Sequence, residues 1–267
     1  MHNYKDNQLI TDANTCFSLA AMSVLGDRDE QEDSFGFALK KDEGLAVVCD
    51  GMGGYNGGAT VSAMAVDSFL KDYTQSPFWA EPSKKMIELS KNADALVCDY
   101  CSGKGTEYAF HAGTTLVSIY IKKKDLYWCS VGDSRAYLFR NGEFVQLTQD
   151  QNYKAVLQGK LNTGVIDENE YQAEIKKGEA LISYLGIGNL NLIDFNEIKL
   201  ELQSNDRIII MSDGLYKLLS DDEISRITNN FTNVGDALQA LELKARKNSK
   251  SVQISRDNMT VIIIKIN

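Results

Sequence analysis

The stretch VVCDGMGGYNGGATVSA, residues 47–63, begins as an apolar run, meets Asp50, passes five glycines and then takes on the spacing of a helix. Asp is depleted within strands and common in turns, so the acid marks the point where a buried strand should end. Glycines have no Cβ atom and let the backbone turn sharply and approach a ligand closely. The stretch therefore predicts a strand, a tight turn at a binding site and a helix.

Aspartates stand at one end of four apolar runs that are far apart in the sequence. GLAVVC runs into Asp50, LYWCSVG into Asp133 and RIIIMS into Asp213, while NMTVIIIKI begins directly after Asp257. Any one of these acids alone fits a turn former. If the four strands share a sandwich, their carboxylates meet on one rim, where two charges 4 Å apart repel by about 4 kcal/mol at an effective dielectric of 20. Such a rim needs cations.

The residues available to bind a cation are almost all oxygen donors. The chain has two histidines, His2 and His111. Carboxylates and carbonyls suit Mg²⁺, Mn²⁺ or Ca²⁺ rather than zinc or copper. In GDRDEQEDSF, Arg28 precedes Glu32 and Asp33 and is a candidate for binding an anionic substrate, because a guanidinium can grip two phosphate oxygens. The alternative is an ordinary salt bridge to a neighbouring acid.

Composition limits the classes of partner. The chain has 267 residues, 43% of them hydrophobic, and a formal net charge of −9 at pH 7. We expect one domain over residues 1–267, with a monomer as the default. No apolar stretch approaches the roughly 20 residues that span a bilayer, and the polar start is unlike a signal peptide, so we expect a cytoplasmic protein with no membrane partner. The acidic charge also predicts no nucleic-acid partner, since Lys122–Lys124 is the one basic run.

The cysteines are interpreted as reduced thiols. They are odd in number, and no second close pair completes a zinc site or a disulfide framework. Cys98 and Cys101 form a CxxC, but they lie on a stretch with helical spacing, so we place them on a helix face.

Hydrophobic spacing predicts a strand-rich chain with several helices. In the first part we expect strands at 17–24, 34–39 and 44–49 and helices at 58–73 and 83–101. Strands on either side of Lys122–Lys124 and of Asn141-Gly142 predict an antiparallel meander, because Asn-Gly favours a tight hairpin. Residues 150–190 are polar and weakly helical and are interpreted as an insertion or flap. Further strands are expected at 198–203, 206–212 and 259–266, with helices at DDEISRI and at 234–247.

Together these windows resemble the metal-dependent Ser/Thr protein phosphatases of the 2C type, the PPM family, in its bacterial form. GDRDEQEDSF resembles the family's G-x-R-x-x-N-E-D element, and VVCDGMGGYNGG resembles its D-G-[HM]-G-G element. GTT at 113–115 and the segment 131–150 resemble the middle motifs, and residues 210–224 and 256–264 resemble the last two. Six windows in the right order, spread over the whole chain, make the resemblance specific.

The resemblance implies an α+β fold, in which a central sandwich of two antiparallel β-sheets is flanked by α-helices on both sides, with a flap insertion at about 150–190. It also implies a centre of two Mn²⁺ or Mg²⁺ ions at one end of the sandwich. Carried over by position, Asp50 bridges both metals and Gly51 offers its carbonyl. Asp213 and Asp257 complete the shell of one ion.

The same carry-over assigns the remaining site residues. Glu32 and Asp33 hold metal-bound waters, Arg28 binds the phosphate, and Asp133 helps to bind a weaker third metal. The implied reaction is hydrolysis of phosphoserine and phosphothreonine in proteins by a hydroxide that bridges the metals, without a phosphoenzyme. Arg28, Asp50 and Glu32 are then the catalytic residues. The implied partners are phosphorylated proteins that are substrates of a Ser/Thr kinase.

Several positions depart from the family pattern. Met52 stands where many eukaryotic members have a His proposed to protonate the leaving group, although bacterial-type members commonly carry Met. Gln31 replaces the usual Asn, and Gln151 follows Asp150 where the family usually has His. LISYLG at 181–186 lacks the usual Thr-Arg. Because a thioether cannot donate a proton, the general acid at Met52's position would be a metal-bound water, or none for a good leaving group. The last changes fall in or beside the flap and bear on substrate choice and flap contacts more than on the metal-binding acids.

Two other functions stay open from the sequence alone. An inactive relative could keep the fold and act as a binding or regulatory module. The complete set of candidate metal-binding acids argues against this alternative, because an inactive protein would not need to keep them. Alternatively, the chain could be a two-metal hydrolase of another phosphate ester, such as a phosphodiester.

Overall fold

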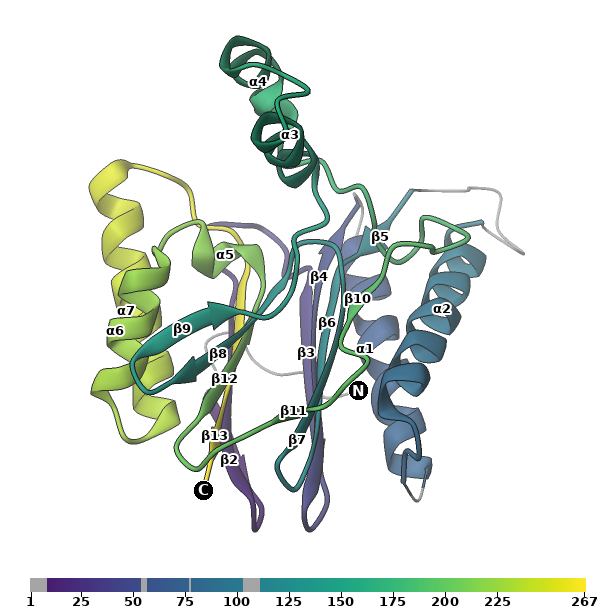
Figure 1. The fold of residues 1–267 in the computed structure, drawn as a ribbon, viewed down its shortest axis with the longest axis vertical. Helices are drawn as coiled ribbons and strands as arrows, with labels where there is room; N and C mark the ends of the chain where they lie inside the picture. Colours follow the sequence, from purple (N-terminus) through teal and green to yellow (C-terminus); the bar gives the residue numbers. More distant parts are fainter. Residues whose placement is uncertain (1–8, 54–56, 77, 103–110) are drawn as a thin grey trace.

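The computed structural model describes residues 9–53, 57–76, 78–102 and 111–267. At its centre, two antiparallel sheets lie face to face (Figure 1). In spatial order, the first sheet contains β1 (Leu9–Ala13), β2 (Phe17–Val24), β13 (Met259–Ile266), β12 (Arg207–Met211), β8 (Arg135–Arg140) and β9 (Glu143–Gln146). The second contains β10 (Asp194–Phe195), β7 (Asp125–Val131), β6 (Leu116–Lys122), β4 (Glu43–Met52) and β3 (Asp33–Leu39), with β11 (Leu200–Glu201) on β7 and β5 (Gly113–Thr114) on β4.

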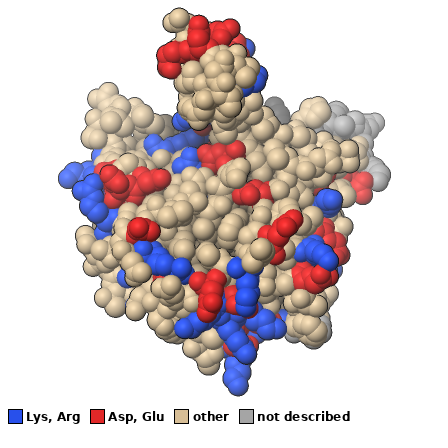
Figure 2. All heavy atoms as spheres, viewed as in Figure 1, with Lys and Arg blue, Asp and Glu red and all other residues tan. Residues whose placement is uncertain are grey.

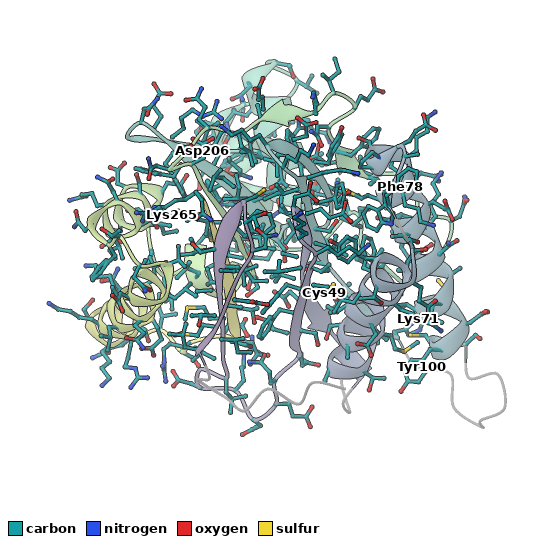
Figure 3. All side chains as sticks on the ribbon, turned by 90° about the horizontal axis from the view of Figure 1, so that it is seen from below. Cys49, Lys71, Phe78, Tyr100, Asp206 and Lys265 are labelled. Atoms are coloured by element: carbon teal, nitrogen blue, oxygen red, sulfur yellow. The ribbon has the colours of Figure 1, made fainter. Side chains whose placement is uncertain are left out.

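Helices cover the outer face of each sheet. α1 (Gly57–Gln75) and α2 (Pro82–Cys101) lie against the second sheet, and α6 (Asp221–Asn230) and α7 (Val234–Val252) lie against the first (Figures 1 and 3). The short helix α5 (Asp213–Tyr216) follows β12 directly. The predicted fold class, an α+β sandwich between helices, is confirmed.

Burial on both faces explains why the central strands are apolar throughout. On β4, Leu45, Val47 and Cys49 join the cluster under α1 and α2, whereas Ala46 and Val48 join the cluster between the sheets. Successive side chains of a strand point to opposite faces, and here both faces are covered. Figure 3 shows Cys49 inside, on the α1 side of the sheet.

The helical spacing in the sequence correctly marked the buried face of α1. Val61, Ala65 and Phe69 are each fully buried against the second sheet. The Asn-Gly hairpin is also confirmed, because Asn141 and Gly142 have φ angles of 52° and 88° between β8 and β9. All five cysteines are free, and Cys98 and Cys101 lie on α2 as predicted.

The segment predicted as a flap forms α3 (Tyr153–Asn162), α4 (Glu168–Glu174) and a 3₁₀ turn (Ile175–Lys177). It projects beyond the end of the sandwich (Figure 1). Within the described residues, no helix is both long and apolar enough to cross a membrane.

Three strand assignments need correction. β4 does not end at Asp50 but continues to Met52, because Gly51 and Met52 pair with Thr114 and Gly113 of β5. Of the strand expected at 198–203, Leu200–Glu201 alone forms ladder pairs, at the edge of the sheet. β1 was not predicted, since its residues are exposed or half-buried and show no continuous apolar pattern.

Candidate metal centre

The predicted acids converge at the end of the sandwich from which the flap projects. Asp33 on β3 and Asp50 on β4 are direct partners in the antiparallel ladder. Asp33 is buried, and its Oδ2 accepts a hydrogen bond of 2.7 Å from the Ser212 hydroxyl. Ser212 ends β12 in the other sheet and precedes Asp213. This contact therefore brings acids of both sheets together.

Backbone hydrogen bonds hold Asp50 in place. Its N–H donates to the Thr115 hydroxyl over 2.9 Å. Its carbonyl oxygen accepts from the Thr114 hydroxyl at 3.0 Å and from the Thr115 N–H at 2.8 Å. The GTT segment thus fixes the backbone from which the Asp50 carboxylate extends.

Glycine is required at position 51 by a close approach within the chain. The Gly51 N–H donates to the Glu32 carbonyl over 3.1 Å. A Cβ atom at Gly51 would lie 2.6 Å from the Glu32 carbonyl oxygen and closer still to the Gly58 carbonyl. The glycines of the opening stretch therefore let the β4 end, the Glu32 loop and the start of α1 meet at the site.

Asn258 fastens the loop that carries Arg28 and Glu32. Its Oδ1 accepts from the Glu32 N–H at 2.8 Å, and its amide donates to the carbonyls of Leu25 and Glu30 at 2.9 and 3.0 Å. Sequence reasoning did not identify Asn258 or Ser212. The available signal was their position, because each is a polar residue directly beside an acid at a strand end.

Two basic side chains already contact acids of the group. Arg28 Nη2 lies 2.7 Å from Asp257 Oδ2, and both side chains are substantially exposed. Lys217 Nζ lies 2.5 Å from Asp213 Oδ2. The salt bridge weighed as the alternative for Arg28 is therefore present in this structure.

Burial and mutual repulsion dominate the electrostatics of the acids. Burial raises the pKa of Asp50 well above its usual value, and repulsion from Asp33, Asp213, Asp133 and Asp257 adds to the effect. Burial likewise raises the pKa of Asp33, against the lowering effect of its hydrogen bond from Ser212. A positively charged ligand would stabilise this group of buried, mutually repelling carboxylates.

Asp133 joins the group from the β7–β8 turn. Burial and repulsion from Asp213 raise its pKa to about 6, against hydrogen bonding from Asn152 and the charge of Lys217. Asn152 Nδ2 donates to Asp133 Oδ2 over 3.2 Å. Gln151, which stands in place of the family's His, is buried and accepts from the Gly132 N–H at 2.9 Å through its side chain.

The base of the flap rests on the same site. The Thr114 N–H donates to the Leu185 carbonyl over 3.1 Å, and the Leu185 N–H donates back over 2.8 Å. The LISYLG segment, which departs from the family pattern, therefore lies against the strand that pairs with Gly51. Figure 2 shows acidic and basic side chains close together beneath the projecting flap.

The donor set fits hard divalent cations. Among the described residues, Asp33 Oδ1 and Asp213 Oδ1 are buried carboxylate oxygens without a hydrogen-bond partner. In the same part of the chain, no three Asp, Glu, His or Cys side chains are gathered as they would be around an ion. Unpartnered carboxylate oxygens are the ligands that Mg²⁺ and Mn²⁺ prefer.

Comparison with known families decides what kind of protein this is. Residues 24–249 match the family described as Protein phosphatase 2C. The chain belongs to the protein phosphatase 2C family. The match runs from the end of β2 into α7 and includes Asp33, Asp50, Asp133 and Asp213.

Curated relatives of this phosphatase 2C chain carry matching names. It is 26% identical over 242 residues to the serine/threonine phosphatase Stp of Listeria welshimeri, which covers 90% of this chain and 92% of the relative. It is 27% identical over 230 residues to the protein phosphatase PhpP of Streptococcus pneumoniae, which covers 84% and 86%. The family and the enzyme class predicted from the sequence are confirmed.

Solved structures show the same fold. The serine/threonine phosphatase of S. agalactiae superposes with a TM-score of 0.81 at 23% identity, over 94% of this chain and all of that one. The catalytic domain of the phosphatase PstP, solved in complex with two manganese ions, superposes with a TM-score of 0.73 at 24% identity, over 94% and 98% of the two chains.

Proposed function

We propose that this phosphatase 2C chain hydrolyses phosphoserine and phosphothreonine in proteins and requires two Mn²⁺ or Mg²⁺ ions. The observation that carries the proposal is the convergence of acids from both sheets, in which two buried carboxylate oxygens have no hydrogen-bond partner among the residues that the structure describes. The names of the Listeria and streptococcal relatives support the activity, and the manganese complex of PstP supports the cofactor.

The residues divide into ligands and supports. Asp50, Gly51 through its carbonyl, Asp213 and Asp257 would hold the two ions. Glu32 and Asp33 would hold water beside these ligands. When bound, divalent ions supply a nucleophile from water at neutral pH and stabilise charge on phosphoryl oxygens.

Arg28 orients the phosphoryl group of the substrate. Its guanidinium is about half exposed, and a phosphate dianion offers it a bidentate partner in place of Asp257. In this role Arg28 stabilises the phosphoryl oxygens as negative charge develops on them. Attack by water in line with the leaving oxygen needs no covalent phosphoenzyme.

The chain has no acidic side chain at position 52 to protonate the leaving serine or threonine oxygen. The Met52 thioether carries no exchangeable proton, so it cannot protonate the leaving oxygen. The substrates we propose are proteins that a Ser/Thr kinase has phosphorylated. We propose that the enzyme acts on them as a monomer in the cytoplasm.

The test compares Asp50→Asn with Asp125→Asn on phosphothreonine peptides and on a phosphodiester, after removal of metals with EDTA and addition of Mn²⁺. Asp125 is a control far from the site, because it pairs with Lys199 at the turn between β6 and β7. We expect phosphate release from phosphothreonine peptides by the wild type and Asp125→Asn, and a loss of at least about 100-fold in Asp50→Asn. Turnover of a phosphodiester alone would favour the other hydrolase, and no turnover of any substrate would favour an inactive binding module.

A further inference from the structure

Lys217 links an acid of the candidate metal centre to the flap. It follows α5 directly, one helical turn after Asp213. Its Nζ lies 2.5 Å from Asp213 Oδ2 and 2.7 Å from Glu179 Oε2. Glu179 belongs to the flap segment just after the 3₁₀ turn, so one ammonium group joins carboxylates of two separate parts of the fold.

The ammonium group divides the roles of the two Asp213 oxygens. Oδ2 is taken by Lys217, whereas Oδ1 is buried and without a hydrogen-bond partner among the described residues. A carboxylate held in this way offers a single oxygen to an incoming ion. Side chains that hold a metal-binding carboxylate in this manner orient it and commonly influence the affinity of the site for its metal.

The residue before Lys217 contacts the turn that carries Asp133. The Tyr216 hydroxyl donates to the Asp133 carbonyl over 3.0 Å, so α5 and the Asp133 turn are held together beside the ammonium group. The positive charge of Lys217 therefore lies at the end of the acid group that contains Asp133 and Asp213.

We propose that Lys217 is a positioning residue that acts as the chain's own cation at this end of the site. It leaves Asp213 Oδ1 for one ion, takes the place of a third divalent ion between Asp133 and Asp213, and holds the flap through Glu179. This inference rests on the proposed function, because it needs the two-ion centre. The third metal expected from the family resemblance is then absent from this enzyme at moderate Mn²⁺ concentrations.

The test counts bound Mn²⁺ by calorimetry and follows hydrogen exchange of residues 150–190 in the full chain. The wild type should bind two ions, and Lys217→Gln should bind a third and exchange its flap amides about two- to fivefold faster, as expected when a partly exposed ion pair is lost. Lys217→Arg, which keeps the charge, should bind two ions. Glu179→Gln should speed flap exchange while the count stays at two.

Lys199→Gln is the matched control, because Lys199 forms an exposed ion pair with Asp125 away from the site. It should behave as the wild type in both measurements. A count of two ions with unchanged flap exchange in a folded Lys217→Gln protein would overturn the inference about Lys217. A wild type that binds no Mn²⁺ would instead overturn the proposed two-ion function.

Discussion

At the scale of single residues, the site is built from charges that the fold alone does not neutralise. Asp33 and Asp206 show the contrast, since both are buried aspartates. Asp206 accepts several hydrogen bonds from Arg140, the shortest 2.6 Å long. Asp33 instead faces other acids, and one of its oxygens has no hydrogen-bond partner in the described part of the chain. A buried charge without a partner costs stability, and the cost is tolerated where a ligand later supplies the opposite charge.

This contrast predicts opposite effects of the same substitution. In metal-free protein at pH 7, Asp33→Asn should raise the free energy of unfolding by about 1–3 kcal/mol, because it removes a buried charge that its neighbours repel. Asp206→Asn should lower it by about 1–3 kcal/mol, because Arg140 loses its partner. Urea unfolding in EDTA measures both. If Asp33→Asn instead destabilised the metal-free protein, the negative charge of Asp33 would not be repelled by the neighbouring acids.

At the scale of elements, local chemistry at helix ends can be tested separately from the site. α6 begins with a capping box, in which Ser220 Oγ accepts from the Glu223 N–H and the Glu223 carboxylate accepts from the Ser220 N–H. Glu223 Oε1 also lies 2.8 Å from Nζ of Lys244 on α7. The hydrogen bond from Lys244, followed by those from Ser220 and Asn248, lowers the pKa of Glu223 to about 2.

A lowered carboxyl pKa gives a defined pH dependence. The folded state favours the ionised form, so the contribution of Glu223 to stability is complete above its ordinary pKa of 4.5 and is lost as the pH falls towards 2. Glu223→Gln should therefore cost about 1 kcal/mol at pH 7 and progressively less below pH 4.5. Denaturant unfolding over this pH range measures the difference, with Asp222→Asn as the control that keeps the capping box. A cost that does not depend on pH would contradict the assignment.

Elements were predictable from the sequence where one local pattern determines them. The spacing of Val61, Ala65 and Phe69 indicated α1 because a helix must bury one face, and Asn141-Gly142 indicated a hairpin because few residues accept its φ angles. β1 and β5 have no such pattern. β1 pairs with β2 at the edge of one sheet, and β5 pairs with the end of β4 that extends beyond its pairing with β6, so both depend on the assembled sheets.

At the scale of the whole molecule, the sandwich brings together acids that are far apart in the chain. Asp50 and Asp213 were predictable as candidates, because an acid at the end of an apolar run is visible in the sequence. The contacts of Asn258 with the Glu32 loop and of Lys217 with Glu179 were not, since each joins segments whose proximity arises only after folding. The candidate acids can thus be picked out from the sequence, whereas the residues that contact and orient them can be identified only in the structure.

In the proposed function, these acids together hold two divalent ions. Anomalous diffraction from crystals of the full chain grown with Mn²⁺ can locate such ions, with Asp50→Asn crystals as the comparison. We expect two anomalous peaks within coordinating distance of Asp50, one of them also reached by Asp213 and Asp257, and their loss in Asp50→Asn. A folded wild-type protein with Mn²⁺ in the crystal and no peak beside Asp50 would contradict it.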